Sequence, residues 1–306
     1  MWKPPVLGAA LAVCMAVVLL PGCQRRPPAT AANPHYVVGA AWRGDGVWFY
    51  PDEAYKATQT GIAQIDPRRH APLTADSEAY DPDALAASHQ TLPLPAIARV
   101  TDLDNGRQIE VRINDRGPPN PARLISVTPR AATLLGMTGP ARVRLEVLHE
   151  ETQAAIEGVG GAPKLALVAA PVGSVQVTDL PPPGQTAPPQ AAPFAGSPVA
   201  TPVPVSAAAL TRLPQRVLQG APEPGRIALL LGTFTNAGPA GMQAAAVPGL
   251  APRIERERTG RSVAYTVIAG PYDAILDADA ALDQAIRAGV TGARLVIEAQ
   301  SGGPAD

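Results

Sequence analysis

Apolar and polar residues alternate along three segments in the first half of the chain. Residues 96–102 and 107–113 alternate on either side of the turn 103–106, whose Asp-Asn-Gly sequence is typical of a hairpin. Residues 141–148 alternate in the same way. Short alternating strands with isolated helical turns between them are typical of small closed barrels. The pattern therefore predicts a mainly β domain over residues 34–150.

Two short helices are expected between these strands. One covers residues 82–88 and follows Asp81, which is a good capping residue. The other covers residues 129–135, with Thr128 as its cap, a proline in its first turn and Gly136 at its end.

The last part of the chain has a different pattern. Strands are predicted at residues 226–231, 252–257, 263–268 and 293–298, and helices at residues 241–247 and 278–288. The order strand, helix, strand, strand, helix, strand (βαββαβ) is typical of a small split sheet with both helices on one face. Residues 225–300 are therefore expected to form a second domain, of the α+β class.

Alanine and proline dominate the segment between the two domains. Residues 151–224 include the runs Pro181-Pro-Pro-Gly184 and Val203-Pro-Val and show little hydrophobic periodicity. Such a segment cannot bury enough apolar surface to offset the entropy of ordering it, so we expect a disordered, extended linker. Residues 23–33 should form a shorter tether of the same kind.

The amino terminus has the pattern of an export signal. Lys3 is followed by an apolar run over residues 6–20 and by Leu20-Pro-Gly-Cys23. A run of about 15 apolar residues is shorter than a membrane span needs, so residues 1–22 are interpreted as a signal peptide. One alternative is an ordinary secretory signal in which Cys23 is incidental. However, Leu-x-Gly-Cys resembles the lipobox of bacterial lipoproteins, which implies a lipid on Cys23, and Gln24 implies sorting to the outer membrane.

Composition argues against several kinds of function. The other cysteine, Cys14, lies in the signal, so the mature chain can form neither an intramolecular disulfide nor a cysteine-based metal site. The four histidines lack metal-ligand spacing, and we expect neither a metal nor a cofactor. The formal net charge is -1 and basic residues are not clustered, so no nucleic-acid partner is expected.

Several ordered motifs between residues 36 and 149 resemble the rare lipoprotein A family. They are Thr74-Ala-Asp-Ser-Glu78, Ala84-Leu-Ala-Ala-Ser-His89 and Arg112-Ile-Asn-Asp-Arg-Gly-Pro118. The resemblance implies a six-stranded double-psi β-barrel. In the last domain, Gly232-Thr-Phe234 and Gly270-Pro-Tyr272 resemble turns of a sporulation-related repeat (SPOR) domain, which binds peptidoglycan strands stripped of their stem peptides. A generic ferredoxin-like sheet is the alternative there.

The resemblance to rare lipoprotein A also implies a reaction. Proteins of this family resemble lytic transglycosylases, which cleave the β-1,4 bond between N-acetylmuramic acid and N-acetylglucosamine and leave a 1,6-anhydro sugar. For this chain it implies endolytic cleavage of naked glycan strands, with a role in cell-wall organisation and septation. Such a reaction needs a carboxylic acid that protonates the leaving oxygen and then accepts a proton from the attacking hydroxyl group.

Three residues fall on the family's matching positions: Glu78, His89 and Asp115. We predict Asp115 as the general acid/base, Glu78 as a carboxylate that tunes or shares its proton, and His89 as the residue that orients one of them. Each also has a structural interpretation: Asp115 could stabilise its turn, His89 could end a helix and Glu78 could be solvated. Substrate contacts are predicted for Arg112, Arg116 and Asp81.

Two departures from the family pattern leave other hypotheses open. An aromatic Ala-Ser-Trp-Tyr-Gly surface for sugar rings is replaced by Ala63-Gln-Ile-Asp66, and Ile-Asp-Leu-Ser is replaced by Ile125-Ser-Val-Thr128. Ser126 cannot donate a proton at neutral pH where the family has an aspartic acid. The barrel could therefore be degenerate, in a lipoprotein that only binds glycan. Expansin-like loosening without cleavage is a third hypothesis, but it needs exposed aromatic residues, which this chain is expected to lack.

The same resemblance implies the partners and the location. The expected partners are peptidoglycan glycan strands, a membrane through the lipid on Cys23, and proteins of the division septum. The expected location is the cell envelope, on the outer membrane facing the periplasm, with enrichment at the septum.

Overall fold

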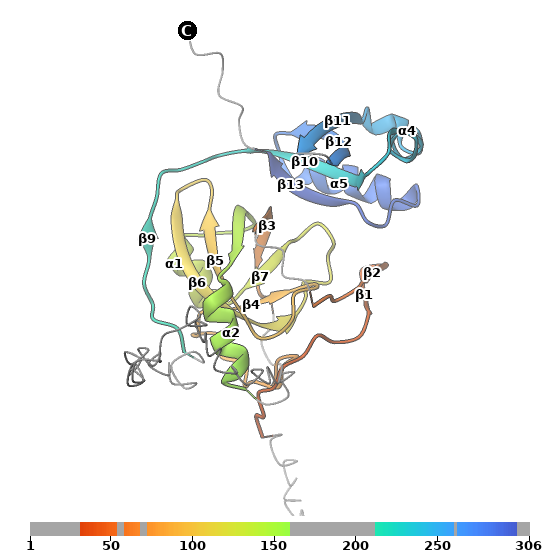
Figure 1. Ribbon diagram of the computed structural model, residues 1–306. Coiled ribbons are helices and arrows are strands. Elements are labelled where there is room, and N and C mark those ends of the chain that lie inside the picture. Colours follow the sequence, from red (N-terminus) through yellow and green to blue (C-terminus); the bar gives the residue numbers. More distant parts are fainter. Residues whose placement is uncertain (1–30, 54–57, 68–71, 160–211, 260–261, 299–306) are drawn as a thin grey trace, which may run out of the picture. The chain divides into compact units, whose positions relative to one another are not determined.

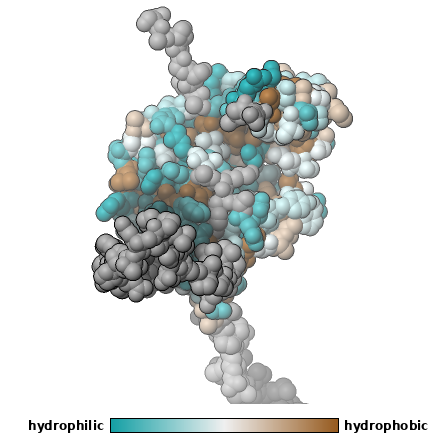
Figure 2. All heavy atoms as spheres, viewed as in Figure 1, coloured by the Kyte–Doolittle hydropathy of each residue, from teal (hydrophilic) through white to brown (hydrophobic). Residues whose placement is uncertain are grey.

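The computed structural model describes residues 31–53, 58–67, 72–159, 212–259 and 262–298. The predicted signal peptide, Cys23 and the larger part of the predicted linker lie outside the described residues. Among the described residues, no helix has the length and apolar character needed to cross a membrane. The face seen in Figure 2 is mostly hydrophilic with smaller apolar patches, as is usual because polar atoms cannot cover a whole protein surface.

Six strands close into a barrel, which confirms the predicted fold class (Figure 1). The sheet order is β4-β7-β3-β8-β5-β6, and β4 also pairs with β6. The pairs β3–β7 and β4–β6 are parallel and the others are antiparallel, a mixed arrangement that fits a double-psi barrel. The strands are β3 (Thr58–Ile65), β4 (Ala86–His89), β5 (Ala96–Asp102), β6 (Arg107–Arg116), β7 (Ile125–Val127) and β8 (Ala141–Val147).

The predicted hairpin of β5 and β6 is present, but β5 is buried on both faces. Inward residues such as Val100 and Ile113 fill the barrel core. The second face of β5 is covered by α2 (His149–Glu157), whose Thr152 side chain hydrogen-bonds both the N–H and the carbonyl of Ile97. The sequence pattern missed α2, because it assigned residues from 151 onward to the linker.

The expectation of a helix over residues 82–88 is wrong. Residues 86–89 form β4, which pairs with β6 on one side and with β7 on the other. The alanine-rich sequence favours a helix locally, but pairing with two strands distant in the sequence decides the structure. The second predicted helix is confirmed as α1 (Pro129–Leu135), with the Thr128 side chain as its cap and Gly136 in the left-handed conformation at its end.

A small hairpin precedes the barrel. Its strands are β1 (Trp42–Gly44) and β2 (Val47–Phe49), which pair in antiparallel register. The rings of Trp42 and Phe49 stack with their centroids 4.6 Å apart. The hairpin is joined to the barrel by a hydrogen bond from Trp42 Nε1 to the carbonyl of Gln90, 3.0 Å long.

The segment before the last domain packs along the barrel. Leu213 is buried in the barrel core cluster, and β9 (Leu218–Gln219) pairs with the start of β6. The backbone N–H of Glu223 donates to the carbonyl of Leu103 at 2.9 Å. Residues 212–224, which the composition had placed in the linker, are therefore held by the barrel in the structure.

The last domain has the predicted order of elements. They are β10 (Arg226–Phe234), α4 (Ala237–Ala245), the 3-10 helix η1 (Pro248–Leu250), β11 (Arg253–Thr259), β12 (Ser262–Tyr272), α5 (Ile275–Arg287) and β13 (Arg294–Glu298). The sheet order is β11-β12-β10-β13, all antiparallel. Leu229 on β10 shares one core cluster with Ala240 of α4 and Leu282 of α5, so both helices cover the same face of the sheet.

Candidate functional site

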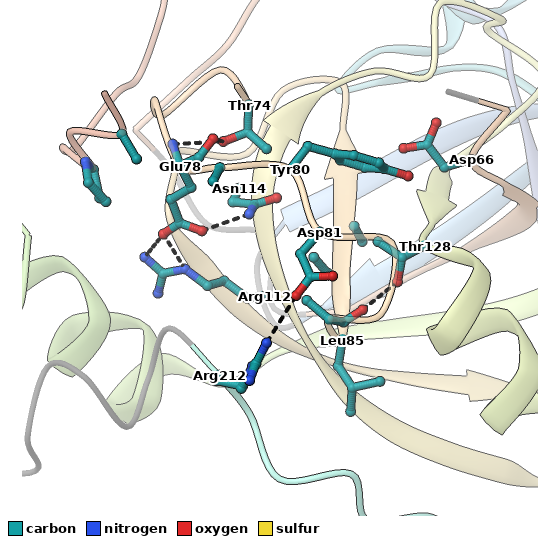
Figure 3. Close-up of a pocket in the computed structure, with 16 residues that line it drawn as sticks. Asp66, Thr74, Glu78, Tyr80, Asp81, Leu85, Arg112, Asn114, Thr128 and Arg212 are labelled. Carbon is teal, nitrogen blue, oxygen red and sulfur yellow. Dashed lines mark hydrogen bonds and ion pairs between the residues drawn. The ribbon is translucent and has the colours of Figure 1, made fainter. Parts of the chain in front are cut away.

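A cavity of about 290 Å³ lies beside the segment that precedes β4 (Figure 3). This volume is near the lower end of the roughly 300–1,000 Å³ that is usual for ligand pockets. The cavity receives polar side chains from the segment before β4, from β6 and from the end of β3. They include Asp66, Thr74, Glu78, Asp81, Arg112 and Asn114.

Glu78 is a carboxylate that is bonded through both of its oxygens at this cavity. Its Oε1 lies 2.7 Å from Arg112 Nε and 2.5 Å from Arg112 Nη2, and its Oε2 accepts from Asn114 Nδ2 at 2.7 Å. Arg112 and Asn114 are two residues apart on β6, so their side chains leave the strand on the same face. Because both side chains of the ion pair are almost fully buried, each ion depends on the other for its stability. The interpretation of Glu78 as a solvated residue is therefore wrong.

Asp76 is a buried carboxyl group that the sequence analysis did not single out. Its side chain is fully buried, and Oδ1 accepts from Thr74 Oγ1 at 2.6 Å and from the backbone N–H of Glu78 at 3.2 Å. Oδ2 has no hydrogen-bond partner within the described part of the chain. Burial, followed by the charge of Glu78, raises the pKa of Asp76 to about 7. The sequence feature that could have identified Asp76 was its place as a second acidic residue, two positions before Glu78.

Asp115 is held against the same segment. Its Oδ1 accepts from the backbone N–H of Ala75 at 2.9 Å and from that of Arg116 at 2.7 Å. The carboxyl group is buried, and Asp115 is paired in register with Ser88 of β4. The structure therefore links Asp115 to the segment that carries Asp76 and Glu78, although Asp115 does not line the cavity of Figure 3.

Arg116 is engaged with backbone carbonyl groups. Its Nη1 donates to the carbonyls of His89 and Leu92, and its Nη2 donates to that of Val38. Burial lowers its pKa to about 10, which leaves it a cation at neutral pH. In this conformation Arg116 joins the amino-terminal segment to the end of β4. Its predicted contact with substrate stays a prediction.

His89 is buried at the end of β4 rather than at the end of a helix. Its Nδ1 accepts from the backbone N–H groups of Thr91 and Leu92, both at 3.1 Å. A nitrogen that accepts hydrogen bonds carries no proton, so the neutral ring has its proton on Nε2. These two bonds fix the ring orientation, and the interpretation of His89 as a helix-terminal residue is wrong.

The other residues singled out by the sequence differ in their contacts and burial. Asp81 lines the cavity and forms an ion pair with Arg212 at 3.2 Å, and Arg212 is largely exposed. Ser126, at the position of the family aspartate, is buried, and its hydroxyl oxygen has no partner among the described residues. Asp66, from the segment that replaces the aromatic motif, is buried and lines the same cavity as Glu78. The roles assigned to these residues stay predictions.

Comparisons with known proteins concern the barrel. A family model described as "Lytic transglycolase" matches residues 58–147. Proteins named "Endolytic peptidoglycan transglycosylase RlpA" are similar to part of the chain. The protein of Escherichia coli (strain K12) is 43% identical over 106 residues, which are 34% of this chain and 29% of that protein.

Two further relatives carry the same name. The protein of Pseudomonas aeruginosa (strain UCBPP-PA14) is 41% identical over 119 residues, 38% of this chain and 33% of that protein. The protein of Rickettsia bellii (strain RML369-C) is 33% identical over 131 residues, 41% of this chain and 58% of that protein. The chain thus spans less than two thirds of the length of each relative. The closed mixed barrel agrees with the family match, so residues 58–147 are similar to the lytic transglycolase family in fold as well as in sequence.

Proposed function

We propose that the barrel is an endolytic lytic transglycosylase that acts on peptidoglycan glycan strands. The observation that carries the proposal is the group of three buried carboxyl groups, Asp76, Glu78 and Asp115, joined by hydrogen bonds to one segment beside a cavity. Carboxyl groups in different environments are what acid–base cleavage of a glycosidic bond requires. The family match over residues 58–147 and the names of the relatives support the same reaction.

In the proposed mechanism, Asp115 acts as the general acid and then as the general base. It donates a proton to the glycosidic oxygen as the β-1,4 bond after N-acetylmuramic acid breaks. It then takes a proton from the C6 hydroxyl group of the same sugar as that oxygen attacks the anomeric carbon, so that a 1,6-anhydro sugar forms and no water is consumed. Glu78, ion-paired with Arg112, stabilises the positive charge that develops on the sugar ring. The cycle uses no cofactor.

His89 and Asp81 have supporting roles in this proposal. The fixed His89 ring keeps the end of β4 in place beside Asp115, since β4 and β6 are paired there. Asp81, on the wall of the cavity, is available to the hydroxyl groups of the glycan.

The finer features of the proposal concern the whole chain. We propose that a lipid on Cys23 anchors the protein to the outer membrane on its periplasmic side. The βαββαβ domain, as a SPOR-like module, would hold naked glycan strands at the septum. In this arrangement the tether over residues 23–33 holds the barrel off the membrane. Septal proteins would then be neighbours of the complex.

The test is digestion of denuded glycan by the purified full-length chain, followed by mass spectrometry. We expect internal cleavage with 1,6-anhydro-N-acetylmuramic acid ends, and a loss of at least about a hundredfold in rate for Asp115→Asn, as is typical when a general acid is removed. Asp83→Asn, which changes an exposed carboxylate before β4, is the matched control and should keep full activity. The absence of anhydro ends, or an unchanged yield from Asp115→Asn, would overturn the proposal.

A second candidate function is glycan binding without cleavage. Two observations favour it: Ser126 stands where the family has an aspartic acid, and the Arg116 guanidinium is engaged with backbone carbonyl groups. Under this hypothesis the full-length chain retains denuded glycan in a pull-down assay and never produces anhydro ends. The same digestion assay therefore separates the two candidates.

A further inference from the structure

The hairpin of β1 and β2 presents two exposed aromatic side chains. Trp48 is 54% exposed and Tyr50 is 68% exposed, whereas their neighbours Val47 and Phe49 are 3% and 8% exposed. This alternation places Trp48 and Tyr50 on the same side of the strand, with their backbone positions about 7 Å apart. The expectation that this chain lacks exposed aromatic residues is therefore wrong.

The hairpin is fixed to the barrel close to the predicted catalytic residues. The Trp42 ring stacks on Phe49 and donates from Nε1 to the carbonyl of Gln90, the residue that follows His89. The backbone N–H of Asp52 donates to the carbonyl of Thr91 at 3.2 Å. Figure 1 shows the hairpin beside the end of β4.

A second contact joins the hairpin to the loop that follows Asp115 and Arg116. Gly44 lies so close to Pro119 that a side-chain carbon at Gly44 would come within 2.7 Å of the Pro119 backbone. Gln90 holds the same loop, since its Nε2 donates to the carbonyls of Pro118 and Asn120, both at 3.1 Å. The hairpin that carries Trp48 and Tyr50 is therefore held rigidly next to the ends of β4 and β6.

We infer that Trp48 and Tyr50 form a stacking subsite for the sugar rings of a glycan strand, at the His89 end of the candidate site; the inference rests on the proposed function. Aromatic rings offer large contact area with little conformational entropy to lose, and their polar edges tolerate water. The segment 63–66, where the family resemblance places an aromatic surface, carries no aromatic residue. The hairpin supplies such a surface from a different part of the chain, and its fixed position lowers the cost of binding.

The kinetic test compares Trp48→Ala/Tyr50→Ala with the unaltered full-length chain on denuded glycan. A subsite that binds ground state and transition state alike changes KM and leaves kcat unchanged. We expect KM to rise about tenfold to a hundredfold, and Trp48→Phe/Tyr50→Phe to stay within about threefold of the unaltered chain because stacking is kept. Leu218→Ala is the matched control, since Leu218 is an exposed apolar residue on β9, and its KM should not change.

A binding measurement gives a readout that does not need cleavage. The chain has three tryptophans, Trp2, Trp42 and Trp48, and none lies in residues 225–300, so the last domain contributes no tryptophan fluorescence of its own. The full-length Asp115→Asn variant is titrated with denuded glycan while tryptophan fluorescence is followed. We expect a saturable change that Trp48→Phe in the same background removes and that Leu218→Ala keeps.

The two measurements separate the subsite from the proposed function. If the unaltered chain cleaves glycan and Trp48→Ala/Tyr50→Ala has the same KM, the subsite is refuted and the proposed function stands. If no variant cleaves but the fluorescence change depends on Trp48, the subsite stands and the proposed cleavage fails. A fluorescence change that persists in Trp48→Phe would also overturn the subsite.

Discussion

The buried carboxyl group of Asp76 makes the stability of the barrel depend on pH. The unfolded chain releases this proton near the usual pKa of 3.8, whereas burial and the charge of Glu78 raise the pKa in the folded barrel to about 7. Between these values the folded state holds a proton that the unfolded state has lost, so stability falls as pH rises. The stabilisation is complete below pH 3.8 and is lost as pH rises through about 7. The difference between the two pKa values corresponds to about 4 kcal/mol.

The substitution Asp76→Asn removes this titration and keeps the shape of the side chain. The amide oxygen can still accept from Thr74 Oγ1 and from the backbone N–H of Glu78, as Oδ1 does now. Asp76 faces the charges of Glu78, Arg112 and Arg116, and these are unchanged in the variant. We therefore expect the variant to gain stability relative to the unaltered chain by about 4 kcal/mol between pH 4 and pH 8.

The assay is urea unfolding at a series of pH values, followed by tryptophan fluorescence. Trp42 and Trp48 lie on the hairpin that packs on the barrel, so the signal follows the barrel transition. Asp83→Asn is the control, because Asp83 is an exposed carboxylate before β4, and its difference from the unaltered chain should not vary with pH. If the Asp76→Asn difference varies by less than about 1 kcal/mol over this range, the reasoning about burial is refuted.

Two further stability predictions follow from the same segment. Arg112→Leu should lower the free energy of unfolding by about 3–5 kcal/mol, because Glu78 loses its buried partner. The control Arg99→Leu removes half-exposed ion pairs and should lower the free energy of unfolding by less than about 1 kcal/mol. Equal losses for the two variants in urea unfolding would contradict this prediction. Ser77 has a φ of 65°, in the left-handed region where a residue with a side chain is strained and glycine is not. Ser77→Gly should therefore stabilise the barrel by about 0.5–1 kcal/mol. An unchanged or lower midpoint in urea unfolding would contradict this prediction.

Local sequence patterns predicted the elements whose signals lie within a few residues. Helix α1 has its cap, its proline and its terminal glycine in nine consecutive positions, and the hairpin of β5 and β6 has its turn between two alternating strands. Changes in the hydrophobic period along the sequence predicted the βαββαβ order of the last domain. The predicted ends of its elements differ from the observed ends by up to four residues. The resemblance to rare lipoprotein A singled out Glu78, His89 and Asp115, and the structure connects all three to the segment before β4 or to the β4–β6 pair.

Only the tertiary structure decided the features that depend on contacts between distant segments. Residues 86–89 became a strand because β6 and β7 flank them, and α2 formed where it could cover the outer face of β5. The high pKa of Asp76 arises from complete burial, and the exposure of Trp48 arises because Val47 and Phe49 face the opposite way. The sequence by itself determined which residues and elements are available; burial and long-range pairing determined their environments, because both depend on neighbours that no local pattern contains.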